Sequence, residues 1–234
     1  MEKSQADFTR RYADGQLRTR PLAPTIAPDL DAGRYLLTFD NGLQAQIHVP
    51  PGYQRSRPLP LLAIFHGAHG LDGGAVDLAS AWAKRHGALL IAQKSHAASW
   101  DLLRGAWGVD LAFTDFLLAW SMQRYAIDAA RIGISGFSDG ASYALSVGLG
   151  NGDLFSDILA FSPGFMRPAK RVGRTRIYVA HGSGDQVLPV DCGRRIAGQL
   201  AEEEYDVYYD EFDGGHTVPP PQAEAALRRF AKRP

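Results

Sequence analysis

The sequence predicts an α/β fold in which a mostly parallel central sheet carries an antiparallel hairpin at its amino-terminal end and helices on both faces. Three observations predict it. Residues 34–40 and 43–49 have strand character and flank Asn41-Gly42, a dipeptide typical of hairpin turns. Residues 59–65 form a continuous apolar run, as expected for a strand covered on both faces. From there, strand and helix patterns alternate to the end of the chain.

Each later element follows from its own pattern. The segment 109–124 places its apolar side chains at helical spacing, whereas the apolar runs between the helices have the length of strands. The expected helices span 74–85, 109–124, 139–149, 191–204 and 222–232. The expected strands span 88–93, 131–135, 157–161, 176–180 and 206–212. Ligands of such sheets bind beyond the carboxyl ends of the strands, so the loops after Phe65, Gln93, Ser135, Phe161, Ala180 and Phe212 are where a site is expected.

The chain is expected to hold one domain. Residues 1–30 contain three prolines and no clear periodicity, which predicts an extended or partly disordered arm. Residues 31–234 show no internal repeat and no second domain boundary, which predicts a single α/β domain.

The composition limits the classes of substrate and partner that are expected. Lys+Arg and Asp+Glu are both 25, so the basic excess of a nucleic-acid or anionic-membrane binder is missing and a small neutral substrate is favoured. No stretch approaches the ~20 apolar residues of a membrane span. Cys192 is the one cysteine, so no intramolecular disulfide is expected. A cytoplasmic protein is predicted, while a signal peptide removed earlier and the oligomeric state stay open.

The segment Gly136-Phe137-Ser138-Asp139-Gly140 matches the G-x-S-x-G nucleophile elbow. A serine at the tip of a tight strand-to-helix turn has strained backbone angles, and side chains two residues to either side would collide. Glycine at both places removes that collision. A strand directly before this motif and a helix directly after it indicate that Ser138 is a nucleophile, whereas Ser135 belongs to the strand.

A serine nucleophile needs a histidine to take its proton and an acid to orient that histidine. In this kind of fold the order along the chain is Ser, Asp, His. Two histidines follow Ser138. His216 lies on a glycine-rich loop after the last strand and is predicted to be the base, whereas His181 ends a strand and is expected to bond locally. Asp185, in the loop that leaves this strand, is predicted to be the acid.

Three other acids compete with Asp185. Asp191 looks like a helix N-cap, Asp210 belongs to the last strand, and Asp213 is too close to His216 to orient it independently. Asp185 could also be a solvated turn residue.

These segments resemble the phospholipase/carboxylesterase family, the small α/β-hydrolases that include acyl-protein thioesterases. The elbow and the run from His181 to Pro189 carry most of the resemblance, together with His66-Gly67, Gly215-His216 and Ala98-Ser99-Trp100-Asp101. It extends from about Leu59 to the carboxyl end. Polyhydroxyalkanoate depolymerase-like and feruloyl esterase-like proteins have similar landmarks, so the subfamily stays open.

The resemblance implies an oxyanion hole made by the backbone amides of Ala68 and Asp139. Two positions depart from the family pattern. Ala141 stands where a further glycine is usual, and His69 replaces a small residue in the first loop. His69 is therefore expected to narrow or polarise the pocket.

Together these residues predict a serine esterase that hydrolyses a small ester through an acyl-enzyme, with no cofactor and no metal. His66 and His69 lack the carboxylate or cysteine partners of a metal site. The tentative pocket residues are His69, Trp100, Trp107, Phe165 and Leu188. Trp100 and Trp107 belong to the loop 95–108, which is expected to overhang the elbow, either as a pocket wall or as packing. A thioesterase, a peptidase or a binding module on the same fold remain alternatives.

Overall fold

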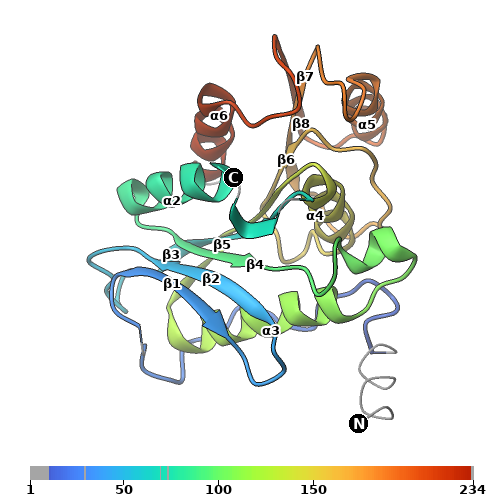
Figure 1. Cartoon of the computed structure of the whole chain (residues 1–234). Coiled ribbons are helices and arrows are strands. Elements are labelled where there is room, and N and C mark those ends of the chain that lie inside the picture. Colours follow the sequence, from blue (N-terminus) through green and yellow to red (C-terminus); the bar gives the residue numbers. More distant parts are fainter. Residues whose placement is uncertain (1–10, 29, 69, 73, 233–234) are drawn as a thin grey trace.

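The computed structural model of the chain describes residues 11–28, 30–68, 70–72 and 74–232. Within these residues an eight-stranded sheet runs in the order β1-β2-β4-β3-β5-β6-β7-β8 (Figure 1). The strands are β1 (Gly33–Thr38), β2 (Gln44–Val49), β3 (Leu59–Phe65), β4 (Leu89–Gln93), β5 (Ile127–Phe137), β6 (Asp157–Phe161), β7 (Arg176–Gly182) and β8 (Val207–Phe212). The β1–β2 and β2–β4 pairs are antiparallel and all other pairs are parallel, which confirms the predicted fold class.

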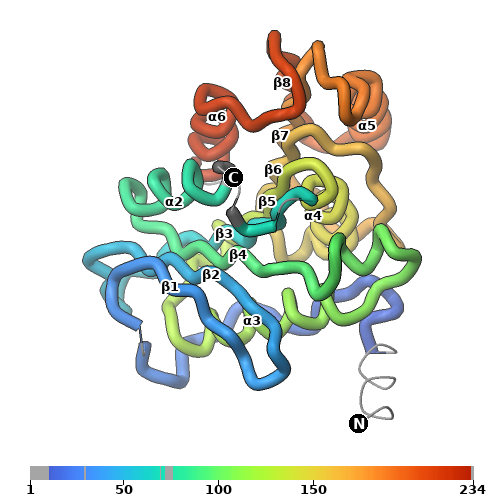
Figure 2. The backbone as a smooth tube through the Cα atoms, viewed as in Figure 1, coloured from blue at the N-terminus to red at the C-terminus, as the bar shows by residue number. Residues whose placement is uncertain are grey.

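Helices cover both faces of the sheet (Figure 2). They are α2 (Gly74–His86), α3 (Val109–Arg124), α4 (Asp139–Gly150), α5 (Asp191–Glu202) and α6 (Pro220–Ala231), with short 3-10 turns η1 (Gly70–Asp72) and η2 (Asp101–Arg104). Each face of the sheet packs against its helices through its own buried apolar cluster. One joins the sheet to α3, α4 and α5, and the other joins it to α2 and α6. The sheet is thus enclosed on both sides, as the fully buried β3, β4 and β6 require.

Two features differ most from their sequence predictions. Strand β5 begins at Ile127 rather than at residue 131, because residues 127–130 are interrupted by Asp128 and are partly or fully exposed, so they lack the buried apolar run that predicted the rest. The opening hairpin closes with a longer turn than the expected two residues. Phe39 N–H donates to Leu43 O, and Gly42 takes a left-handed φ of 78° between them.

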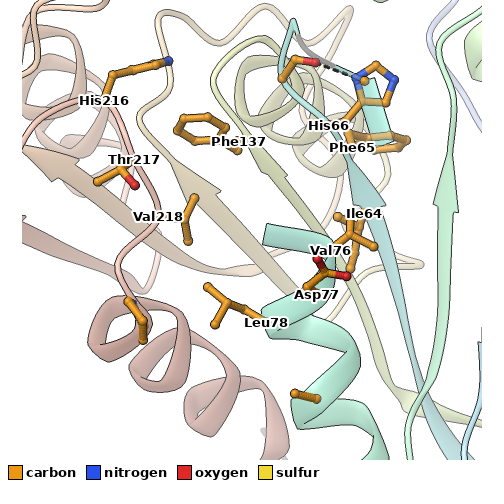
Figure 3. Close-up of a pocket in the computed structure, with 14 residues that line it drawn as sticks. Ile64, Phe65, His66, Val76, Asp77, Leu78, Phe137, His216, Thr217 and Val218 are labelled. Carbon is orange, nitrogen blue, oxygen red and sulfur yellow. Dashed lines mark hydrogen bonds between the residues drawn. The ribbon is translucent and has the colours of Figure 1, made fainter. Parts of the chain in front are cut away.

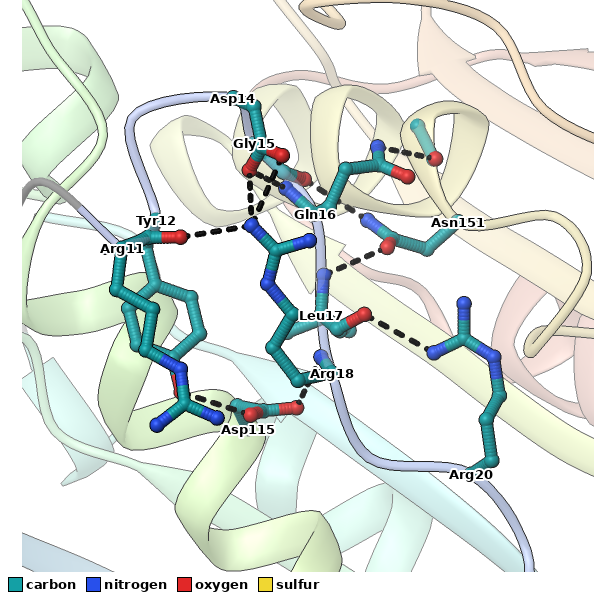
Figure 4. A network of polar contacts seen from close by, with 11 residues as sticks. Arg11, Tyr12, Asp14, Gly15, Gln16, Leu17, Arg18, Arg20, Asp115 and Asn151 are labelled. Atoms are coloured by element: carbon teal, nitrogen blue, oxygen red, sulfur yellow. Dashed lines mark hydrogen bonds and ion pairs between the residues drawn. The ribbon is translucent and has the colours of Figure 1, made fainter.

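The described part of the arm packs against α3 and α4 through buried polar side chains (Figure 4). Asp115 of α3 accepts hydrogen bonds from the backbone of Arg18 and Thr19 and from the Tyr12 hydroxyl. Asn151, after α4, accepts from Leu17 N–H and donates to Gly15 O. Residues 12–19, a turn at residues 12–14 and a following segment without regular secondary structure, are therefore fixed to the two helices by side chains remote in sequence.

Candidate active site

Ser138 lies in the sharp turn that joins β5 to α4. Its φ is 58°, in the left-handed region that a residue with a Cβ rarely adopts. The flanking glycines explain how the turn is possible. A Cβ on Gly136 would lie 2.1 Å from Gly140 O, and one on Gly140 would lie 2.2 Å from Phe65 O. No other residue type fits at these two positions, so the sequence pattern has a steric cause.

Three predicted side chains from three separate loops meet at this turn. His216 Nε2 lies 2.9 Å from Ser138 Oγ, and His216 Nδ1 lies 2.7 Å from Asp185 Oδ2. Ser138 and Asp185 are 8% and 7% exposed, and the His216 side chain is 16% exposed. Asp185 follows β7 and His216 follows β8, so both come from the carboxyl edge of the sheet, where β5 also presents the serine.

Asp185 is held as an anion. Its other oxygen, Oδ1, accepts hydrogen bonds from the amides of Val187 and Leu188, each at 2.9 Å. Burial by itself would raise the pKa of Asp185, but the hydrogen bond from His216 and these two amides outweigh it and hold this pKa below its ordinary value. A carboxylate fixed in this way orients the His216 ring with Nδ1–H toward the acid and leaves Nε2 free to accept the serine proton.

His181 lies beside the acid and bonds locally. Its Nε2 is 2.8 Å from Leu188 O and 3.4 Å from Asp185 Oδ2, and its side chain is fully buried. Because Leu188 O can only accept, Nε2 carries the proton. His181 thus fixes the Asp185 loop from within the core. The competing acids lie elsewhere: Asp191 pairs with Arg194, and Asp210 accepts from Tyr178.

The predicted oxyanion-hole residues belong to two segments next to Ser138. A Cβ on Gly67 would be 3.3 Å from Ser138 Cβ, so the residue before Ala68 lies against Ser138. Asp139 is the first residue of α4, where a helix leaves its amide without a partner within the helix. Its carboxylate accepts from Ser99 Oγ at 2.8 Å, which connects the start of α4 to the loop 95–108. His69 lies outside the described residues.

The loop 95–108 is packed down by aromatic contacts and buried charge. Trp100 is 0% exposed, stacks on Tyr143 at 4.9 Å and donates from Nε1 to His66 O. Trp107 is 7% exposed and also contacts Tyr143. The sequence left two roles open for these tryptophans, a pocket wall or packing of the loop. Their burial agrees with packing.

A buried pair of aspartates anchors the same loop. Asp101 Oδ2 accepts three backbone amides from residues 108–111, and Asp110 accepts the amides of His96 and Asp101. Burial raises the pKa of Asp101, and burial followed by the charge of Asp101 raises that of Asp110 to about 6. The sequence analysis missed this pair, because the backbone amides that the two carboxylates accept become visible only in three dimensions.

A pocket of about 500 Å³ opens beside His216. Val76 and Leu78 of α2 line one side, and Thr217 and Val218 of the loop before α6 line another, with Phe137 between them (Figure 3). These residues were not predicted, because they lie far apart in sequence and carry ordinary core side chains.

The remaining predicted pocket residues lie elsewhere. Phe165 and Leu188 are partly buried and do not line this pocket. The Leu188 side chain lies close to Gly164, since a Cβ built on this glycine would be 3.3 Å from it. Within the described residues, no group of three or more His, Cys, Asp or Glu side chains could hold a metal ion. None of the described helices has the length and apolar character needed to cross a bilayer.

The sequence and fold match known proteins. The model of the phospholipase/carboxylesterase family matches residues 113–230, about half of the chain. A thermostable esterase has a TM-score of 0.72 and 23% identity over 87% of this chain, which spans only 63% of that protein's length. The S-formylglutathione hydrolase of Staphylococcus aureus has a TM-score of 0.67 and 14% identity, covering 90% of this chain and 100% of that one.

A third similar structure is a ferulic acid esterase from Anaeromyces mucronatus in complex with ferulic acid. It has a TM-score of 0.63 and 14% identity, covering 89% of this chain and 93% of that one. At these identities the likenesses show a shared α/β-hydrolase fold. No curated protein matches the chain in sequence.

Proposed function

Because the chain belongs to the phospholipase/carboxylesterase family and is on that ground a carboxylic ester hydrolase, we propose that Ser138, His216 and Asp185 are its catalytic triad and that its substrates are small neutral esters. The observation that carries the proposal is the continuous line of contacts from Asp185 Oδ2 through His216 to Ser138 Oγ, at 2.7 and 2.9 Å. These are the distances that proton transfer from a serine requires.

The reaction runs in two steps. His216 Nε2 takes the Ser138 proton while Oγ attacks the ester carbonyl, and the amides of Ala68 and Asp139 hold the oxyanion. His216 then gives its proton to the leaving alcohol oxygen, and the acyl group remains on Ser138. A water molecule, deprotonated by His216, attacks this acyl-enzyme and releases the acid. Asp185 stabilises the imidazolium in both steps and stays ionised, in keeping with its lowered pKa.

The neutral substrate is supported by the surroundings of the triad. The formal net charge of the chain is zero, and the pocket beside His216 is lined mostly by apolar side chains. A charged ester would lose its hydration there without gaining a partner of opposite charge. We also propose that residues 31–234 fold as the single catalytic domain, since one sheet and its two covering layers account for all the described elements in that range.

Hydrolysis of p-nitrophenyl esters of increasing acyl length tests this function, with Ser138→Ala and Ser135→Ala compared with the wild type. Ser135 is a buried serine of β5 and serves as the matched control. We expect turnover to vanish in Ser138→Ala and to persist in Ser135→Ala. Equal rates in the wild type and Ser138→Ala would contradict the proposal. Turnover of thioesters but not of oxygen esters would move the substrate class to thioesters on the same triad.

A further inference from the structure

The pocket beside His216 is lined by none of the tentative pocket residues that the structure describes, which are Trp100, Trp107, Phe165 and Leu188. It lies on the face of the sheet covered by α2 and α6. Val76 is 4% exposed and Ile64 is 3% exposed, so the floor is buried hydrocarbon. The one acid among its lining residues, Asp77, has a side chain 64% exposed and pairs with Arg34, which places its charge at the rim.

His216 belongs both to this pocket and to the proposed triad. Its ring packs on Phe137 with centroids 4.7 Å apart, while its Nε2 faces Ser138 Oγ. In the proposed reaction the leaving oxygen must take a proton from this Nε2. The group attached to that oxygen therefore extends from the serine toward the His216 side of the site, where the pocket opens.

The acyl group extends the other way. Around a carbonyl carbon attached to Ser138, the oxyanion occupies the direction of the Ala68 and Asp139 amides and the leaving group occupies the direction of His216. The acyl substituent takes the remaining direction. The Leu188 side chain lies close to Gly164, and the next residue, Phe165, packs with the cluster on the α3 and α4 face of the sheet, opposite α2 and α6. The acyl part and the alcohol part of an ester thus contact different walls of the site.

We propose that this pocket is the alcohol subsite, and that the enzyme prefers esters of bulky apolar alcohols, such as benzylic ones, over esters of methanol. The inference rests on the proposed function and adds to it the side of the ester that is recognised. A volume of about 500 Å³ exceeds what a methyl group fills, so a small alcohol leaves apolar wall exposed to water. Burial of a benzylic ring on that wall is expected to raise kcat/KM by about tenfold or more.

The experiment compares methyl, benzyl and 2-naphthylmethyl acetates, which share one acyl group. Ala81 of α2 lines the pocket and is exposed, so Ala81→Phe narrows the pocket without disturbing the core. Lys84 is an exposed residue of the same helix outside the pocket, and Lys84→Phe is the matched control. A second series of methyl esters with longer acyl groups separates alcohol preference from acyl preference.

We expect the wild type and Lys84→Phe to prefer the benzyl ester by about tenfold or more, and Ala81→Phe to lose this preference. Ala81→Phe should lose far less kcat/KM toward methyl acetate and the methyl esters of longer acids than toward the benzyl ester. A wild type that hydrolyses all three acetates equally, or an Ala81→Phe variant that keeps the preference, would overturn the subsite while leaving the triad intact. No turnover of any ester, with Ser138 unreactive toward a fluorophosphonate, would overturn both proposals.

Discussion

Gly140, at the start of α4, lies against the backbone of Phe65 at the end of β3. A Cβ at this glycine would be 2.2 Å from Phe65 O and 2.5 Å from His66 O. The turn that holds Ser138 and the strand that leads into the proposed oxyanion loop are therefore in direct backbone contact. This contact fixes the distance between Ser138 and the Ala68 loop before any substrate binds, which is the condition for a preorganised oxyanion hole.

Gly140→Ala is expected to force these backbones apart. The free energy of unfolding should fall by about 3 kcal/mol, as for overpacked cores, and kcat should fall with it. Gly198→Ala is the control, because a Cβ at Gly198 of α5 meets nothing within 4 Å and should stabilise the helix by about 0.5–1 kcal/mol. Chemical denaturation and steady-state kinetics measure both. A Gly140→Ala variant of wild-type stability would contradict the contact.

Replacement of the proposed acid should lower the rate and leave substrate binding nearly unchanged. Asp185→Asn keeps the size of the side chain but presents an amide to His216, which favours the wrong tautomer of the ring. We expect kcat to fall by about 10³–10⁴ with little change in KM. Asp191→Asn is the matched control at the competing acid, whose side chain is 79% exposed. A larger loss of kcat in Asp191→Asn than in Asp185→Asn would show that Asp185 is not the acid of the triad.

How much of this site could be predicted from sequence depends on how local each cause is. The elbow was predictable because the steric need for Gly136 and Gly140 arises within five residues. The positions of Asp185 and His216 followed from strand order, since parallel strands bring their carboxyl ends to one edge. The fold class was predictable for a similar reason, because the periodicity of each strand and helix is a local property. The structure confirms this prediction.

The rest could not be predicted because its causes are distant. Val76 and Val218 line the pocket beside His216, yet in sequence they look like any core valine. Trp100 and Trp107 had two plausible roles, and their contacts with Tyr143 distinguish these only in three dimensions. The arm lacks periodicity of its own. Its position depends on Asp115 of α3 and on Asn151 at the end of α4, which are distant in the sequence.

The buried Asp101–Asp110 pair should make stability depend on pH. Burial and then the charge of Asp101 raise the pKa of Asp110 to about 6, above the 3.8 expected when unfolded. Its contribution is therefore fully present below pH 3.8 and is lost as pH rises through about 6. The loss amounts to about 3 kcal/mol, at about 1.36 kcal/mol for each pKa unit.

Asp110→Asn removes this titration, and contributions of carboxyl groups remote from Asp110 cancel in the difference between the two proteins. We expect the wild type to be the more stable near pH 4.5 and its advantage to shrink by about 2 kcal/mol by pH 7.5, because about 1 kcal/mol of the total is already lost below pH 4.5. Urea unfolding at several pH values measures this difference. A difference that stays constant with pH would mean that Asp110 does not titrate in this range.

Removal of Asn151 should release the arm. Its side chain is fully buried, accepts from Leu17 N–H and donates to Gly15 O and Val147 O. Asn151→Ala leaves these groups without partners and should cost about 2–4 kcal/mol of stability. Trypsin should then cleave after Arg18 faster than in the wild type. Unchanged cleavage at this arginine, despite lower stability, would show that the arm is held by other contacts.

The proposed function requires that Ser138, activated by His216, form the covalent intermediate. Its most direct measurement is intact-mass spectrometry after treatment with a fluorophosphonate, followed by peptide mapping of the label. We expect one label for each wild-type chain, on Ser138, no label in Ser138→Ala, and labelling at least about 100-fold slower in His216→Ala. A label on another residue, or equal labelling of Ser138→Ala, would contradict the claim.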